Sequence, residues 1–229
     1  MTVALSWLLS AALAISPVSV TPRDTLIAEL ILIEFAENGQ MARSGGPQHH
    51  GQCKRFQVDC FEKVAGNYML AGYPDVLLFM PLDHADKKIS GRPTGTCWDM
   101  PDPSTGNAFV EAARYDVDRT LSVKENQALA REFLTQARAG DILQMVASYA
   151  SGGRGSHTLM FTRPYDARLE NLYWIDSNFA NRRIDGLRYG IVRAYQEWPV
   201  DEVARWLGKD WNNGATLYRL SDDIVERPR

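Results

Sequence analysis

The sequence lacks the features that mark several large classes of protein. It carries no basic cluster: 25 Lys and Arg residues are outnumbered by 28 Asp and Glu residues, and the formal net charge is -3. Proteins that bind DNA or RNA usually present a concentrated basic face, so this composition disfavours nucleic acid as a partner. Internal repeats and low-complexity tracts are also missing from the sequence. The 229 residues, 45% of them hydrophobic, suit a single globular domain, with or without an insertion.

Cysteine is scarce as well. With only Cys53, Cys60 and Cys97, the chain cannot form a disulfide-dense scaffold, and at least one thiol stays outside any intrachain disulfide. On one helix, Cys53 and Cys60 would lie about 10 Å apart along the axis, which is too far for a bridge. We interpret Cys60 as a buried apolar residue, with a Cys60–Cys97 bridge as the lesser alternative.

The chain has no apolar run of the roughly 20 residues that a membrane-spanning helix needs. Its longest N-terminal run, residues 3–15, is followed by a stretch rich in Ser, Pro and Thr. That arrangement predicts a signal peptide over residues 1–20 and a secreted or periplasmic protein, although no basic residue precedes the run. An N-terminal core helix is the alternative, because leucines recur there at helical spacing.

The hydrophobic pattern changes its period partway along the chain. Helices are expected over residues 24–36, 53–70 and 122–140, the last beginning with a capping box from Ser122 to Glu125 and ending at Gly140. Short alternating segments follow, and they predict antiparallel strands at 140–150, 157–165, 172–179 and 187–195, a helix at 199–208 and a strand at 215–220. This order predicts an α+β fold, with N-terminal helices packed on a small antiparallel sheet.

The segment between the early helices and the capping box has a different character. Residues 72–121 contain five prolines that divide short apolar pieces. We therefore expect one domain over residues 23–229 with an insertion at about 72–121.

Cys53 follows a turn rich in glycine and histidine and begins an amphipathic helix. The exposed N–H groups and the dipole of a helix N-terminus favour a thiolate, and the same N–H groups can stabilise an oxyanion. The side-chain amide of Gln48 or Gln52 is a second candidate oxyanion donor, and the sequence does not choose between them. These positions make Cys53 a candidate nucleophile.

A thiol nucleophile needs a base and a group that orients the base. His157 opens an apolar strand after the glycine-rich turn at residues 151–156, which makes it the natural base. Asp176 and Asn178 end the next strand and share one of its faces, so either can lie beside His157. Asp176 carries the charge that an imidazolium favours, whereas Asn178 could orient the ring or a substrate.

Other interpretations of these residue types are weaker. Cys97 precedes Pro101 and Pro103, which would break a helix beginning there, so it lacks the same activation. His49 and His50 with Cys53 could hold a metal, but no second Cys/His pair stands at finger-like spacing. The glycine-rich turn lacks the Gly-Lys-Ser/Thr ending of a phosphate-binding loop.

Four short motifs occur in a characteristic order: Gly51-Gln52-Cys53 opening a helix, Gly140-Asp141-Ile142-Leu143 leading into a strand, Ser156-His157 opening the next strand, and Asp176-Ser177-Asn178 ending the one after. Together they resemble the CHAP amidase/peptidase domain, a member of the papain-like cysteine hydrolases related to the NlpC-type cell-wall peptidases. The resemblance covers about residues 45–195. It implies a cysteine nucleophile, a histidine base and a polar third residue.

The resemblance also implies a substrate and a reaction. Members of this family usually cleave peptide or amide bonds of peptidoglycan through an acyl-enzyme, and no metal or organic cofactor is implied. Two alternatives stay open: a secreted effector protease that acts on a protein substrate, and a non-catalytic binding module on the same fold. The expected partner is therefore a peptidoglycan peptide or a protein substrate.

Overall fold

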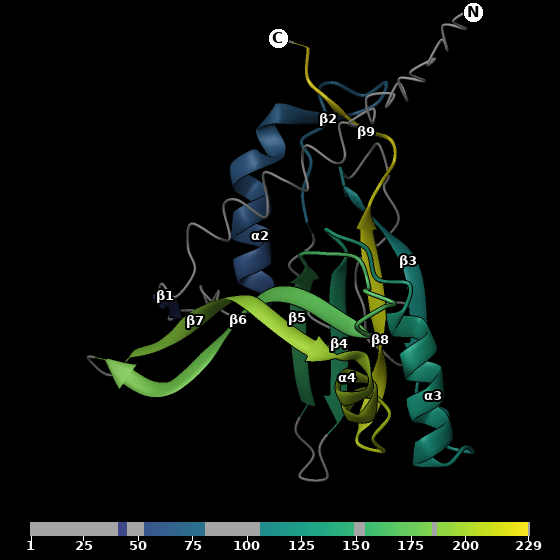
Figure 1. Ribbon diagram of the computed structural model, residues 1–229. Helices are drawn as coiled ribbons and strands as arrows, with labels where there is room; N and C mark the ends of the chain where they lie inside the picture. The colour runs from purple at the N-terminus through teal and green to yellow at the C-terminus, as the bar shows by residue number, and fades with distance from the viewer. Residues whose placement is uncertain (1–40, 45–52, 81–105, 149–153, 185–186, 229) are drawn as a thin grey trace, which may run out of the picture.

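The computed structural model describes residues 41–44, 53–80, 106–148, 154–184 and 187–228 (Figure 1). The expected signal peptide at 1–20 and the expected helix at 24–36 lie outside these residues, as do Gln48, His49, His50, Gln52 and Cys97. The described chain combines helices with antiparallel sheets, which confirms the predicted α+β class.

Seven strands of the described chain form the main sheet, and each is antiparallel to its neighbours. In spatial order they are β1 (Met41–Ser44), β7 (Leu187–Pro199), β6 (Asn171–Ile184), β5 (Arg154–Phe161), β4 (Ile142–Ser148), β8 (Asn212–Leu220) and β3 (Phe109–Asp116). The strands β4 to β7 are consecutive in sequence and pair as hairpin neighbours, as their alternating pattern predicts. The β6–β7 hairpin extends well beyond the rest of the sheet in Figure 1.

A second, smaller sheet and three α-helices complete the described chain. The small sheet pairs β2 (Tyr68–Leu70) with β9 (Ile224–Glu226). The helices are α2 (Cys53–Val64), α3 (Val123–Leu134) and α4 (Val200–Leu207), with the 3-10 turn η1 (Ala65–Asn67) directly after α2.

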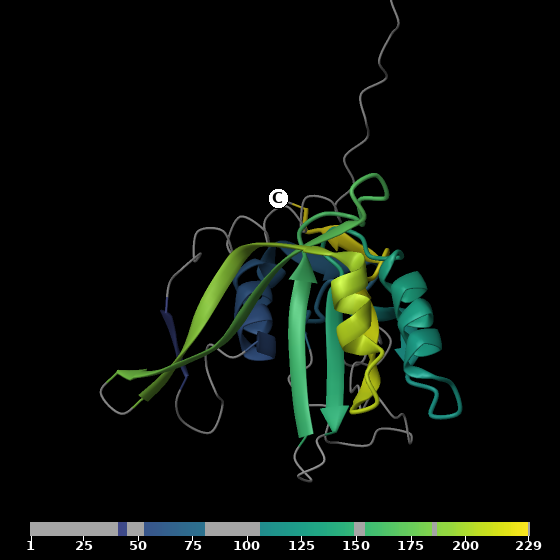
Figure 2. The same ribbon diagram turned by 60° about the horizontal axis from the view of Figure 1, so that its bottom comes forward.

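The main sheet separates two hydrophobic cores. Met160 packs with α2 side chains such as Phe56 and Phe61, whereas its neighbours Leu159 and Phe161 pack with the side chains of α3 and α4. Successive side chains of a strand point to opposite faces, so α2 covers one face while α3 and α4 cover the other. Figure 2 shows α3 and α4 side by side in front, with α2 behind. Because both faces are covered, even polar side chains of the central strands are buried, among them Gln144, Thr158, Asp176 and Thr216.

Two predicted helices end earlier than expected. The helix that begins at Cys53 stops at Val64 and not at residue 70, because Gly66 and Asn67 are poor helix formers and Tyr68–Leu70 pair with β9 instead. The helix with the capping box stops at Leu134 and not at Gly140. Gly140 has a φ of +82° and donates its N–H to the carbonyl of Phe161, so it begins the sheet pairing.

The proline-rich pattern of residues 72–121 did not predict a strand that the structure contains. Residues Phe109–Asp116 form β3, which pairs with β8 at the edge of the main sheet. The last part of the expected insertion therefore belongs to the sheet. Residues 81–105 lie outside the described chain.

None of the helices in the described parts of the chain is both long enough and apolar enough to cross a lipid bilayer.

Candidate active site

Cys53 is the first residue of α2, as its position after the glycine-rich turn predicts. The helix lies across β5 and β6, held by the buried side chains of Phe56 and Phe61. The side-chain amide of Gln57, itself buried, donates to the backbone carbonyl of Ile175 over 3.4 Å. These contacts fix the start of the helix against the sheet, and Cys53 stands in the first turn of the helix, whose backbone N–H groups have no intrahelical acceptor.

His157 lies on β5 just past the end of the β5–β6 pairing, which runs from Phe161 to Leu159. Its side chain is 17% exposed and hydrogen-bonds with the side chain of Cys53. The structure therefore brings together a cysteine and a histidine that are far apart in the sequence. The imidazole is partly reachable from solvent, and Cys53 is half-buried.

Asp176 provides the third contact. Its carboxylate is 1% exposed, and its Oδ2 accepts a hydrogen bond from Nε2 of His157 over 2.7 Å. The contact crosses from β6 to β5 on the diagonal, since Asp176 lies opposite Leu159 in the register. Asp176, one of the two polar residues considered for this role, therefore lies beside the imidazole.

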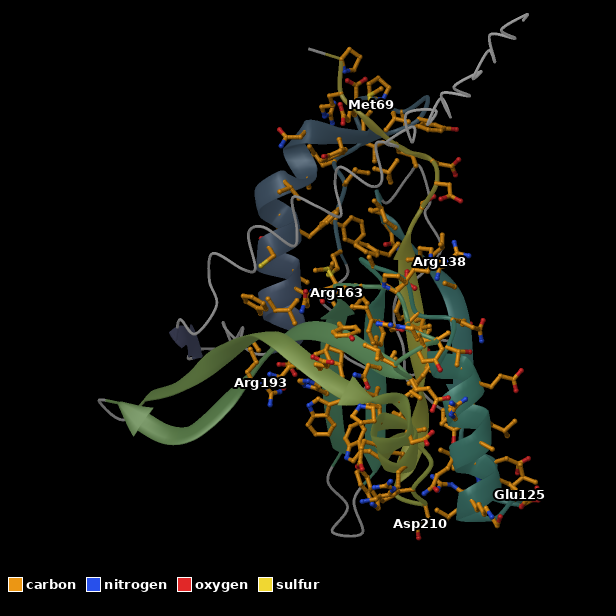
Figure 3. The ribbon with its side chains drawn as sticks, viewed as in Figure 1. Met69, Glu125, Arg138, Arg163, Arg193 and Asp210 are labelled. Carbon is orange, nitrogen blue, oxygen red and sulfur yellow. The ribbon has the colours of Figure 1, made fainter. Side chains whose placement is uncertain are left out.

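A fourth residue, Arg193 on β7, was not expected from the sequence. Its Nε donates to Oδ1 of Asp176 over 2.7 Å, and one of its terminal nitrogens donates to Oδ2 of the same carboxylate. Figure 3 labels Arg193 on the β6–β7 hairpin, below the end of α2 at which that helix begins. No local motif marks this arginine, because only the register of β6 on β7 places it opposite Asp176.

These contacts change the protonation of the histidine. Burial by itself lowers the pKa of His157, but hydrogen bonds to Asp176 and Cys53, together with their negative charges, raise it to about 9. At neutral pH the ring is therefore an imidazolium, and it stabilises a thiolate on Cys53. The thiolate is the nucleophilic form of cysteine.

The carboxylate stays ionised for the complementary reason. Burial would raise the pKa of Asp176, but hydrogen bonds from His157 and Arg193, together with their positive charges, hold it below its ordinary value of 3.8. A charged Asp176 can accept the N–H of the imidazolium throughout the neutral range.

The two ring nitrogens have separate partners. Because Nε2 donates to Asp176, Nδ1 is the nitrogen that remains for the sulfur of Cys53. One nitrogen can then exchange a proton with the reacting groups, while the other holds the ring in place. This arrangement can perform nucleophilic catalysis with proton transfer.

The remaining candidate residues are not tested by these contacts. Asn178 lies on β6 opposite Ile191 of β7, and its side chain is outside the described part of the structure, as is the whole of Gln52. Within the described residues, no group of three or more His, Cys, Asp and Glu side chains is arranged to hold a metal ion. Cys60 is a buried thiol in the core beneath α2.

No protein-family model, curated protein or solved structure matches this chain.

Proposed function

We propose that the protein is a cysteine hydrolase that cleaves a peptide or amide bond through an acyl-enzyme. The observation that carries this proposal is the hydrogen-bonded series Cys53, His157 and Asp176, with the cysteine at a helix N-terminus. A packed structural cysteine needs neither a helix N-terminus nor an imidazolium partner, and both favour reactivity.

Each residue has a distinct role in the proposed reaction. The thiolate of Cys53 attacks the carbonyl carbon and forms a C–S bond, and the backbone N–H groups at the start of α2 stabilise the oxyanion. The tetrahedral intermediate collapses, the C–N bond breaks, and the imidazolium of His157 gives its proton to the leaving amine. Neutral His157 then takes a proton from water, whose oxygen attacks the thioester carbon. The C–S bond breaks, the carboxylic acid product leaves, and the sulfur is again a thiolate beside an imidazolium. Asp176 holds the ring throughout.

The proposed fold family and substrate rest on the motif order rather than on the contacts. A helix that carries the cysteine, followed by strands that carry the histidine and the third residue, is consistent with a papain-like hydrolase of the CHAP type. We therefore propose peptidoglycan as the substrate, cut as an amidase or endopeptidase, by a secreted or periplasmic enzyme. No resident metal or organic cofactor is part of the proposed reaction.

The test compares the purified wild-type protein with its Cys53→Ala and Cys60→Ala variants. Each is incubated with peptidoglycan sacculi, and released fragments are identified by mass spectrometry. We expect fragments from the wild type and from Cys60→Ala, and a loss of at least about a thousandfold in Cys53→Ala, because only Cys53 forms the acyl-enzyme. The masses of the fragments identify the bond that is cut.

The same experiment separates the alternatives when a thiol probe is added. Rapid labelling of Cys53 near neutral pH without release of fragments would contradict the peptidoglycan substrate and favour a protein substrate. Labelling of Cys53 that is slow and unchanged by His157→Ala would contradict the hydrolase itself and leave a binding module.

A further inference from the structure

We propose that Arg193 is a positioning residue that shares the Asp176 carboxylate with His157, fixing the plane of the carboxylate and balancing its charge. The inference deepens the proposed function, because it concerns the regulation of proton transfer at the same site. It rests on the register of β6 and β7, on the hydrogen bonds of Asp176 and on its burial.

The carboxylate is held by a two-point contact. Nε and a terminal nitrogen of Arg193 donate to the two oxygens of Asp176, and Oδ2 also accepts from Nε2 of His157. A guanidinium that donates two parallel hydrogen bonds fixes the plane of a carboxylate, which a single donor cannot do. Arg193 therefore determines where Oδ2 lies relative to the imidazole.

An irregularity in β7 places this arginine. Trp174 lies opposite Gln196, but Asp176 lies opposite Arg193, so two residues of β7, Ala194 and Tyr195, stand against Ile175 alone. With regular pairing, Ala194 would lie opposite Asp176. Since a shift of one residue exchanges the faces of a strand, this β-bulge brings a guanidinium to the carboxylate in place of a methyl group. Bulges that redirect a side chain are common beside active sites.

The charge of Arg193 has a second effect. Asp176 is 1% exposed, so without a counter-ion its whole charge would act on His157. An imidazolium held too strongly gives up its proton reluctantly, and the proposed reaction requires that proton to reach the leaving amine. Arg193 lowers the net negative charge beside the ring, while the hydrogen bond that orients the ring is kept.

The charged groups that act on this pair come from four elements. Those that act on His157 of β5 are Cys53 from α2 and Asp176 from β6. The groups that act on Asp176 of β6 are His157 from β5 and Arg193 from β7. A substitution at Arg193 should therefore change the pKa of His157 through its effect on Asp176.

Two substitutions separate charge from geometry. Arg193→Gln removes the charge but keeps an amide donor, whereas Arg193→Lys keeps the charge but loses the two-point contact. Arg205→Gln is the matched control, since it removes an arginine that pairs with Glu202 on the surface of α4. Because 42% of the Arg193 side chain is exposed, we expect both variants at this position to fold.

The measurement is the histidine titration by NMR, supported by the pH dependence of Cys53 alkylation, and neither needs a substrate. We expect Arg193→Gln to raise the pKa of His157 by about one unit, because a positive charge near the ring is lost. We expect Arg193→Lys and Arg205→Gln to leave it unchanged. If hydrolysis is measurable, Arg193→Lys should lower kcat several-fold and leave KM unaltered, because the plane of the carboxylate is no longer fixed.

A double-mutant test decides whether the effect passes through Asp176. In the Asp176→Asn background, Arg193→Gln should no longer shift the titration of His157. An unchanged or lowered pKa in Arg193→Gln, or a shift that persists in that background, would overturn the inference. Failure to detect hydrolysis would count against the proposed function alone, because the titration is measured without turnover.

Discussion

Two buried aspartates, Asp141 just before β4 and Asp176 in β6, are bound in almost the same way, but among the described residues only Asp176 contacts a histidine. Arg219 donates to both oxygens of Asp141 over 2.7 and 2.6 Å, and Oδ2 of Asp141 accepts a third hydrogen bond from the backbone N–H of Arg138. Arg193 binds both oxygens of Asp176 in the same manner, but there the third donor is the His157 ring. Figure 3 labels Arg138 and Arg193 on opposite sides of the molecule.

The comparison shows how a structural contact differs from a site that can do chemistry. Within the described residues the donors of Asp141 are a guanidinium and a peptide N–H, and neither loses its proton near neutral pH, so their contact joins the start of β4 to β8 without offering proton transfer. The third donor of Asp176 is a ring that can release a proton and whose other nitrogen faces a cysteine. The two aspartates therefore differ in one donor, a peptide N–H at Asp141 and an imidazole at Asp176, and this donor separates a structural contact from a candidate catalytic one. The two arginines also differ in exposure to solvent: the side chain of Arg219 is 18% exposed, and that of Arg193 is 42% exposed.

The largest expected effect comes from the same substitution at both aspartates. Asp176→Asn should lower kcat about a hundredfold or more, because the neutral side chain no longer stabilises the imidazolium. Asp141→Asn should lower the free energy of unfolding by about 3 kcal/mol, because it breaks a buried ion pair. Hydrolysis assays and urea denaturation of both variants measure the two effects.

The two variants serve as controls for each other. Asp141→Asn should keep its activity per folded molecule, and Asp176→Asn should be destabilised less, because Arg193 can turn toward water. Equal losses of activity and stability in both variants would remove the distinction between the two pairs.

A smaller effect concerns pH, because the donor that His157 provides to Asp176 loses its proton at mildly alkaline pH. Since the pKa of His157 is raised to about 9, the imidazolium should persist through the neutral range, and kcat/KM should fall only as the pH rises through about 9. The stability that this protonated ring contributes is complete below its unfolded value of 6.5 and is lost as the pH rises through the folded value. A pH–rate profile checks this. An alkaline decline centred near 6.5 would show that Asp176 and Cys53 do not act on the ring.

The smallest effect belongs to α3, on the face of the sheet away from α2. The hydroxyl of Ser122 accepts from the N–H of Glu125 over 3.3 Å, and the Glu125 carboxylate accepts from the N–H of Ser122 over 2.8 Å. Ser122→Ala should lower the free energy of unfolding by about 1 kcal/mol and leave activity unchanged, while Ser122→Thr should keep both. Urea denaturation measures the change. A loss of activity in Ser122→Ala at full stability would link α3 to the site.

Local signals in the sequence predicted most of the elements of the fold. The capping box of Ser122 and Glu125 begins α3, and the alternating segments after residue 140 form β4 to β7 in order. Such patterns depend on neighbouring residues, so one sequence suffices to recognise them. The strand β3 was not predicted, because the residues before it are rich in proline and its partner β8 lies about a hundred residues away in the chain.

In the candidate site, too, local sequence predicted some features and not others. The sequence by itself determined that Cys53 begins a helix and that His157 and Asp176 lie on neighbouring strands, because helix starts and strand alternation are local properties. Only the tertiary structure decided that α2 lies against β5 and β6, so that the cysteine meets the histidine. It also decided that a bulge in β7 gives Asp176 an arginine in place of an alanine. Long-range packing and register depend on how the whole chain fills its two cores, and no short stretch of sequence carries that information.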